Sequence, residues 1–299
     1  MKAFLRFFLI ICAVILVYNV WVLIGVPDRQ VSLVKTTVSK EEMLVLGADS
    51  GKGNIVGIQP YLTTMHYANI PGFKETLRSY LLEAKKHNWL NTKTILVFPE
   101  NIGNWLIAYE QKNSVYTEKT TAAVLDDMVK SNIFKYLITW LKAPAGSDKK
   151  LYTSFTMKGQ QAGQIYQEVF SELAKEFGVT IHAGSIILSE PSISGDSKII
   201  THKGKLYNSH FVFNPDGTIK PEPVKKEYQI QSAFNFSRSS NDMDSALINT
   251  GTAKYSMDLL FAGDLWDVKT DGRLLIMQKD TVKILPAAKE GRMVNLWIE

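Results

Sequence analysis

The stretch Thr94-Ile95-Leu96-Val97-Phe98-Pro99-Glu100 combines the pattern of a buried strand with a carboxylate at its end. Its first residues are apolar or β-branched, which favours a strand. Pro99 cannot donate to a strand ladder, so Glu100 is expected at the strand's carboxyl end. Ligands bind beyond that end of the strands in open α/β sheets. Glu100 is therefore a candidate functional residue, and a cap or a surface ion pair at a loop is the alternative.

Strand and helix patterns alternate around this stretch. Residues 54–59 (NIVGIQ) are typical of a strand, and residues 72–88 carry apolar side chains at helical spacing. The order strand, helix, strand predicts neighbouring parallel strands joined by a crossover helix. The fold class is therefore predicted to be α/β.

Two more helical patterns follow, over residues 119–142 and 163–177, and Gly178 is a C-cap signal for the second. The aromatic residues of this region are interpreted as core rather than as a substrate platform; they are Tyr136, Trp140 and Tyr166. The first pattern rests on apolar positions at helical spacing; they are Val124, Leu125, Met128, Ile133, Leu137, Ile138 and Leu141.

The second half of the chain reads mainly as strands. Residues 179–188 form a predicted strand in which Gly184 marks a bulge or a close backbone approach and His182 is interpreted as a core histidine. A polar loop is expected over 190–205. The turn Asn214-Pro215-Asp216-Gly217 then predicts a hairpin between 206–213 and 218–224.

The end of the chain divides into a polar stretch and a closing sheet. Residues 229–251 are rich in Ser, Asn and Asp and lose periodicity, which indicates potential disorder. A last antiparallel unit is predicted from 259–268, 273–278 and 293–298.

Composition narrows the function classes. The 299 residues, 45% hydrophobic, suffice for one sizeable core. The net charge is +5, but the basic residues are scattered, which indicates a solvated surface and no nucleic-acid partner. A single cysteine excludes an intrachain disulfide and a cysteine zinc site, and the five histidines lack ligand spacing. We therefore expect neither a metal nor a cofactor.

The N-terminus has the pattern of a membrane anchor. Lys2 and Arg6 precede the apolar run 7–26, which has about the twenty residues needed to cross a bilayer. A cleaved signal peptide is the competing interpretation, but no small-x-small site precedes Pro27. We predict a transmembrane signal anchor over 1–26 with the lipid bilayer as partner of residues 7–26, a linker over 27–53 and one domain over 54–299.

The orientation of the anchor follows from its ends. Basic residues lie on both sides of the span, so the prediction rests on the short basic N-terminus, which is typical of a signal anchor. The domain would then lie outside the cytoplasm, in the periplasm of a bacterium. Cys12 is interpreted as an inert thiol buried in the membrane.

Four segments, in order, resemble motifs of the nitrilase, or carbon–nitrogen hydrolase, superfamily. They are Leu96-Val97-Phe98-Pro99-Glu100; Phe177-Gly178-Val179-Thr180-Ile181-His182-Ala183-Gly184-Ser185; Tyr207-Asn208-Ser209 with the 214–217 turn; and Lys226. The resemblance covers residues 54–228 well. It implies a four-layer α-β-β-α sandwich and a Glu-Lys-Cys site that attacks an amide or nitrile carbon. Glu100 would be the general base and Lys226 the stabiliser of the oxyanion.

The nucleophile of that site does not carry over, because no cysteine follows Cys12. One alignment places Ala262 at the cysteine position, and another treats 262–267 as part of a late hairpin, so that the nucleophile segment is missing and the sandwich incomplete. The family's second glutamate is also missing, since no Glu occurs from 228 to 289. Serines occur in the right interval, but a carboxylate alone is a poor base for a hydroxyl. They are Ser237, Ser239, Ser240, Ser245 and Ser256.

The resulting hypothesis is a membrane-anchored carbon–nitrogen hydrolase (nitrilase or amidase) family domain, acting on amide-type C–N bonds by ancestry and catalytically impaired. A small amide or acyl compound would be its substrate if it were active, and a homo-oligomer is a further candidate assembly. The first alternative is a non-catalytic binding or assembly module at the membrane surface. The second is a deletion variant of a longer hydrolase, which would expose apolar sheet edges and unfold easily.

Overall fold

The computed structural model describes residues 2–26, 38–144, 148–228, 246–250, 253–268, 270, 272–279, 281–288 and 290–299. Its α-helices are α1 (Lys2–Leu23), α2 (Ile70–Lys86), α3 (Asn113–Thr117), α4 (Thr121–Ser131), α5 (Ile133–Trp140) and α6 (Lys149–Phe177), with 3₁₀ turns η1 (Thr64–Tyr67) and η2 (Asn104–Ala108). Its strands are β1 (Val38–Leu46), β2 (Asn54–Gln59), β3 (Tyr61–Thr63), β4 (Thr94–Val97), β5 (Thr180–Ile193), β6 (Ile199–Phe213), β7 (Val224–Glu227), β8 (Ala246–Thr250), β9 (Ala253–Leu259), β10 (Ala262–Asp264), β11 (Leu274–Gln278), β12 (Thr281–Leu285) and β13 (Gly291–Trp297).

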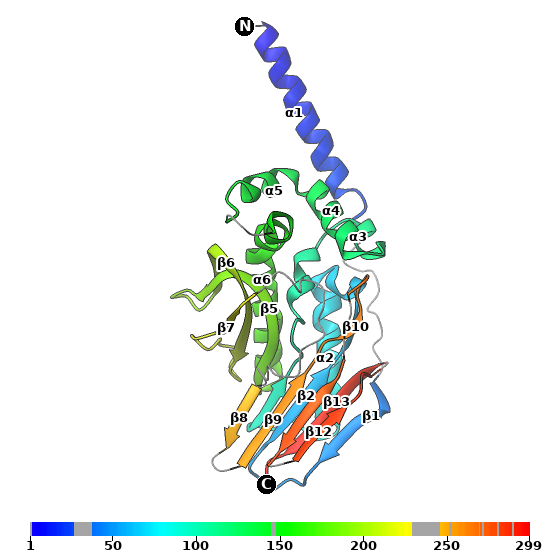
Figure 1. Ribbon diagram of the computed structural model, residues 1–299, viewed down its shortest axis with the longest axis vertical. Helices are drawn as coiled ribbons and strands as arrows, with labels where there is room; N and C mark the ends of the chain where they lie inside the picture. The colour runs from blue at the N-terminus through cyan, green and yellow to red at the C-terminus, as the bar shows by residue number, and fades with distance from the viewer. Residues whose placement is uncertain are drawn as a thin grey trace.

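A seven-stranded sheet with the order β1-β13-β2-β4-β5-β6-β7 organises the body (Figure 1). β2 and β4 are parallel neighbours with α2 between them in sequence, which confirms the predicted crossover unit. β4 and β5 are also parallel, whereas β6 and β7 continue the sheet in antiparallel fashion. β1 runs parallel to β13, so this sheet begins inside the range that sequence assigns to a linker.

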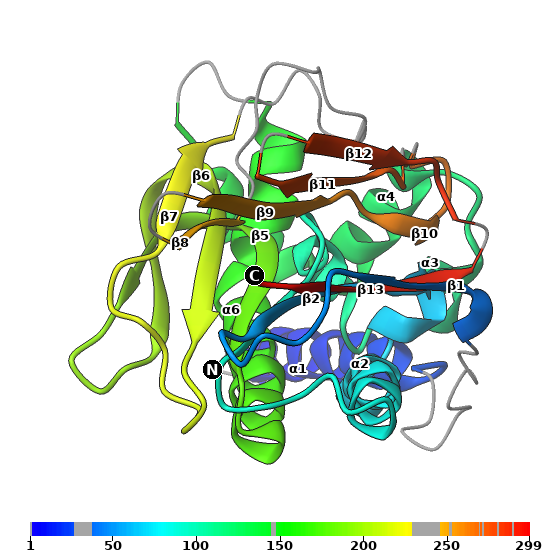
Figure 2. The ribbon, with the colours of Figure 1, turned by 90° about the horizontal axis from the view of Figure 1, so that it is seen from below.

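Two layers cover the two faces of this sheet (Figure 2). α2 and α6 pack on one face, where Phe73 and Phe170 belong to the main apolar core. The four-stranded sheet β12-β11-β9-β8 covers part of the other, where Met257 packs with Val97. Gly57 permits this approach, since a Cβ there would lie 2.1 Å from the Met257 sulfur. The described residues thus form a mixed α/β fold with three of the four layers that the resemblance implies.

Several local predictions are confirmed. β2 has the predicted bounds, and α6 ends at Phe177 with Gly178 as its C-cap in the left-handed conformation (φ 63°). The start of this helix is wrong in the prediction, because α6 begins at Lys149 and not at residue 163. Gly217 also has a positive φ, of 86°, in the turn that follows β6. After this turn only Ile219 bridges back to Phe213, and the strand that pairs with β6 is β7.

The predicted helix over 119–142 is wrong as a single element. α4 ends at Ser131, and α5 begins at Ile133 after Asn132, whose φ and ψ of −132° and 31° are not helical. Val124, Leu125 and Met128 of α4 are buried, whereas no side chain of α5 is fully buried. The core prediction is therefore wrong for Trp140, while Tyr136 is partly buried against the core. Leu137, Ile138, Trp140 and Leu141 are exposed.

Two further predictions are corrected. The polar loop over 190–205 is largely a hairpin, because β5 extends to Ile193 and β6 starts at Ile199, with polar side chains on its solvated surface. The strand predicted over 259–268 lies earlier in the chain, because β9 ends at Leu259. Within the predicted range, only Ala262–Asp264 form a strand, β10, which pairs with β3. Most of the Ser/Asn-rich stretch lies outside the described residues, but its positions 246–250 form β8.

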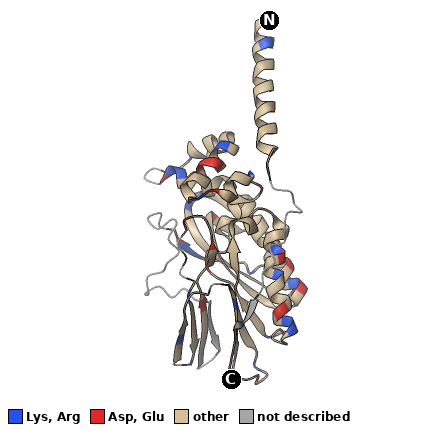
Figure 3. Cartoon of the chain, turned by 90° about the vertical axis from the view of Figure 1, so that its right-hand side faces the viewer, with Lys and Arg blue, Asp and Glu red and all other residues tan. Residues whose placement is uncertain are grey.

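α1 projects from one end of the body (Figure 1). It has 22 residues without buried side chains and is long and apolar enough to cross a membrane. Its charged positions gather at the free end, whereas Lys, Arg, Asp and Glu are spread over the body (Figure 3). This composition is the pattern expected for the anchor.

Candidate functional site

Glu100 lies where the two sheets meet. The Phe98 amide donates to the His182 carbonyl of β5 (2.9 Å), and the Glu100 amide donates to the Leu259 carbonyl at the end of β9 (3.1 Å). The backbone just after β4 is therefore held by β5 on one side and by the second sheet on the other. Glu100 as a residue is half-buried.

Gly184 of β5 allows this turn to sit close to the sheet. Its φ is +73°, and a Cβ there would lie 2.0 Å from the Pro99 carbonyl oxygen. The pairing of β5 with β6 also shifts register between His182 and Ser185. The Ser185 hydroxyl accepts from the Asn101 amide (2.7 Å), which fixes the residue after Glu100. The predicted bulge and close backbone approach at Gly184 are both present.

Lys226 reaches the same region from the edge strand β7. It pairs with Asn208 of β6, and Val224 pairs with His210. Because side chains alternate along a strand, Lys226 shares a sheet face with Val224 and with their partners. His182 faces the same way, since its neighbour in register is Val97, which packs against the second sheet.

A cavity of about 620 Å³ joins these positions. Glu100 and Lys226, the two residues predicted for the site, both line it. The other described lining residues are Val97, Phe98, His182, Ala183, Gly184, His210, Phe211, Val212, Glu222, Val224, Lys225, Met257, Asp258 and Leu259. The cavity thus lies between β4–β7 and β9 and carries carboxylates, lysines and imidazoles on an apolar wall.

Several ionisable residues of this wall were not among the site residues predicted from the sequence, and Asp258 and His182 are two buried or half-buried examples. Asp258, only 6% exposed, was not predicted, because β9 was placed too late in the chain. An acid between Met257 and Leu259 in an alternating strand is the signal that could have identified it. His182 was interpreted as a core residue, but it is half-buried and lines the cavity.

His182 is neutral near pH 7. Burial lowers its pKa to about 4, and the nearby charges of Lys220 and His210 act in the same direction. A neutral imidazole has one donor and one acceptor nitrogen, so His182 can bind a polar ligand without adding charge. Its low pKa makes it a weak base at neutral pH.

The described wall of the cavity contains neither a thiol nor a hydroxyl that could act as the nucleophile. Cys12, the single cysteine of the sequence, lies in α1. Ser256 is buried in β9 and does not line the cavity, and the four serines between 237 and 245 lie outside the described residues. Ala262 pairs with Tyr61 in the small β10–β3 sheet, away from the cavity wall. Leu259 lies beside the Glu100 backbone instead.

The cavity therefore offers acid–base and electrostatic chemistry. Lysine ammonium groups can stabilise a carbonyl or carboxylate oxygen, and carboxylates can accept an amide N–H. Among the residues that the structure describes, no three His, Cys, Asp or Glu side chains are grouped as metal ligands. The wall thus presents charged groups of both signs beside apolar side chains.

Comparisons with protein-family models and with curated proteins find no match. Among solved structures, the chain matches Nit3 of Saccharomyces cerevisiae, a member of branch 10 of the nitrilase superfamily, at 14% identity and a TM-score of 0.26, over 59% of this chain and 44% of that one. It also matches N-terminal amidase with a Gln-Gly peptide, at 14% identity and a TM-score of 0.29, over 60% of this chain and 28% of that one. The chain spans less than half the length of either protein. Part of this chain is thus similar to solved structures, and one of them is a member of the nitrilase superfamily. The sequence motifs resemble those of the same superfamily.

Proposed function

We propose that this chain is a membrane-anchored, nitrilase-like domain that binds a small amide- or acyl-type ligand in the cavity and is impaired in amide hydrolysis. The proposal rests on one observation: Glu100 and Lys226 line the same cavity, and the described wall of this cavity has neither a thiol nor a hydroxyl. A carboxylate and an ammonium group line the cavity and can contact a polar ligand. The described wall therefore lacks the usual groups that form a covalent acyl intermediate.

Ligand binding and amide hydrolysis need different groups in the cavity. Lys226 can interact with the ligand oxygen, and Glu100 can accept from its N–H, so both ends of an amide find complementary charge. The apolar part of the wall favours an acyl chain or another apolar substituent. Attack on the amide carbon would require a nucleophile in addition, and acid–base groups alone supply only part of the usual rate enhancement.

The anchor is the second part of the proposal. The apolar α1 would cross the bilayer, and its short basic N-terminus favours a domain outside the cytoplasm. In a bacterium the cavity would then face the periplasm. A protease-protection assay on intact and permeabilised cells tests this orientation, because an extracytoplasmic domain is cleaved as soon as the outer surface of the inner membrane is accessible.

The test of the cavity uses the full chain in detergent micelles with a panel of short amides and acyl esters. We expect no release of ammonia or alcohol and no acyl adduct in the intact mass. We also expect a ligand-induced rise in Tm that Glu100→Gln and Lys226→Met abolish. Lys198→Met, on the exposed β5–β6 hairpin, is the matched control and should retain the rise. Turnover that Glu100→Gln removes would refute the impairment.

A non-catalytic assembly module at the membrane surface is the second candidate. The exposed apolar side chains of α5 favour it, because they offer a contact surface away from the residues of the cavity. Under this candidate Glu100→Gln leaves function intact, whereas changes such as Trp140→Ala on the exposed helix disturb assembly. The two sets of variants therefore distinguish the candidates.

A further inference from the structure

α5 turns an apolar stripe away from the protein core. Phe134, Leu137, Ile138 and Leu141 are 54%, 48%, 57% and 77% exposed. Their spacing of i, i+3, i+4 and i+7 places them on one side of a helix, the arrangement that normally packs on a core. In α5 the opposite side of the helix packs on the core instead, since Tyr136 contacts it.

α5 is fixed beside the last turns of α1. The rings of Tyr18 and Phe134 meet edge to face with centroids 5.5 Å apart. The Tyr18 hydroxyl donates to the Lys130 carbonyl (2.9 Å) and accepts from the Ile133 amide (3.1 Å). The start of α5 therefore has a defined height along α1, and Figure 1 shows α5 at the end of the body from which α1 projects.

That height corresponds to a membrane–water interface. The body contacts α1 at Tyr18 and Trp21, so the apolar phase ends near these residues. The roughly 20 helical residues that cross a hydrocarbon core of about 30 Å then start near Lys2, and not at residue 7 as the sequence predicts. Tyr and Trp are enriched at this boundary. The Lys112 ammonium lies 3.6 Å from the Trp21 ring centroid and donates to the Trp21 carbonyl (3.0 Å), as expected where the helix leaves the apolar phase.

Basic side chains border the stripe. Lys135 and Lys142 are on α5 or directly after it, and the Lys149 ammonium lies 4.6 Å from the Trp140 ring centroid. A cavity of about 200 Å³ beside α5 is lined by Lys142 and Lys203, among others. Lysines beside an apolar stripe are typical of helices that lie in the plane of an anionic membrane, where their stems cover apolar surface and their ammonium groups reach the headgroups.

We infer that α5 is a second membrane contact, lying in the headgroup–acyl boundary of the bilayer that α1 crosses, with Phe134, Leu137, Ile138 and Leu141 inserted. The inference rests on the proposed anchor. The occupant of the stripe is a lipid surface because the stripe is continuous with α1 at Tyr18 and is bordered by lysines. Two contacts prevent the domain from rotating about the α1 axis, so its cavity keeps one orientation relative to the membrane.

The test places a fluorophore on the stripe in the full chain. Ile138→Cys in a Cys12→Ser background carries a bimane probe, and the protein is reconstituted into vesicles of equal parts phosphatidylcholine and phosphatidylglycerol that contain a lipid quencher at a shallow acyl position. Leu82→Cys, 43% exposed on α2, is the matched control. Leu141→Cys is a second reporter if the first variant does not fold. A probe on the native Cys12 with a deep quencher reports the anchor separately.

We expect the probe at 138 or 141 to be quenched several-fold more strongly than the probe at 82. Equal quenching at these positions, with Cys12 quenched by the deep lipid, would overturn the inference and leave the anchor intact. If the probe on Cys12 escaped quenching as well, both the anchor and the inference would fail. Cross-linking between copies through 138 without lipid quenching would also overturn it, since α5 would then face a second copy.

Discussion

The two faces of the seven-stranded sheet are covered in different ways. On the helical face, the Phe170 ring lies 4.7 to 6.4 Å from four other aromatic rings, which joins α6 to α2, β4 and β6. On the opposite face, the second sheet packs on β2, β4 and β13, and the cavity opens between β4–β7 and β9. One face is filled by apolar side chains, and the other leaves room for ionisable ones.

The helical face therefore contributes mainly to stability, whereas the cavity face offers groups for ligand recognition. The helical face buries large aromatic side chains completely, so its contribution is the removal of apolar surface from water. The other face keeps His182 and Glu100 at a cavity wall, and burial there lowers the pKa of His182. Substitutions on the two faces should therefore have different signatures in stability and in pH dependence.

The largest effect is expected from truncation on the helical face. Phe170 is fully buried, so Phe170→Ala removes apolar contacts and leaves a void. We expect the free energy of unfolding to fall by about 3 to 5 kcal/mol. Denaturant titration of the full chain in micelles, followed by circular dichroism, measures this loss. Leu82→Ala on the outer side of α2, 43% exposed, is the control and should cost less than about 0.5 kcal/mol. Comparable losses in both variants would contradict the assignment of the core.

Sequence located both helices of the helical face through local signals, although α6 begins at Lys149 and its pattern was recognised only from residue 163. The apolar spacing of α2, the C-cap at Gly178 and the strand of β2 each follow from neighbouring residues. Glu100 and Lys226 were placed at one site through the order of motifs, and the structure brings both to one cavity. Their roles in catalysis stay predictions.

The rest depends on contacts that sequence does not contain. The outward stripe of α5 has the same spacing as a core stripe, and only the break at Asn132 and the contact of Phe134 with Tyr18 reverse its direction. Asp258 lines the cavity because the end of β9 contacts the backbone after β4, where the Glu100 amide donates to the Leu259 carbonyl, and these segments are far apart in the chain. Long polar strands such as β6 look like loops because their side chains are solvated rather than alternating with a core.

A smaller effect, specific to the cavity face, is expected from His182. Its pKa is about 4 in the folded chain, against about 6.5 for an unfolded histidine. Between these values the unfolded state binds more protons, so stability falls as the pH is lowered from about 6.5 towards 4. With allowance for its partial exposure, we expect a loss of about 2 kcal/mol.

The measurement compares the parent with His182→Asn across this pH range. The variant lacks the imidazole, so the stability difference between parent and variant should change with pH in favour of the variant at the acidic end. Carboxylates elsewhere titrate in both proteins and cancel in the difference. Parallel curves would show that His182 is as accessible to protons in the folded chain as in the unfolded one.

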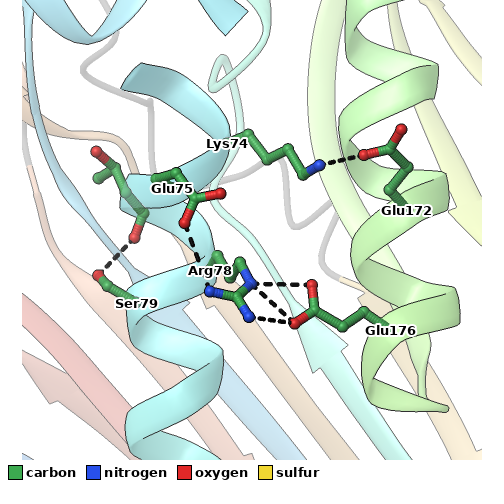
Figure 4. A network of polar contacts seen from close by, with 7 residues as sticks. Lys74, Glu75, Arg78, Ser79, Glu172 and Glu176 are labelled. Atoms are coloured by element: carbon green, nitrogen blue, oxygen red, sulfur yellow. Dashed lines mark hydrogen bonds and ion pairs between the residues drawn. The ribbon is translucent and has the colours of Figure 1, made fainter. Parts of the chain in front are cut away.

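The smallest effect is expected from the ion pairs that join α2 to α6 on the outside of the helical layer. Figure 4 shows Lys74 directed at Glu172 and Arg78 directed at Glu176. The Arg78 Nε donates to both Glu176 oxygens (2.8 and 3.0 Å), and Nη2 lies 2.7 Å from Oε1. These side chains are about one-third exposed, so water and salt weaken the attraction.

A double-mutant cycle of Arg78→Gln and Glu176→Gln should give a coupling energy of about 0.5 kcal/mol, which decreases at high salt. The hydrogen bond from Arg78 also lowers the pKa of Glu176, so the coupling should fade as the pH drops below the ordinary range of a glutamate. The pair Lys86–Glu83, within α2, is a control that does not connect the helices. A salt-independent coupling above about 2 kcal/mol would mean that polar contacts, and not the buried aromatic side chains alone, hold α2 against α6.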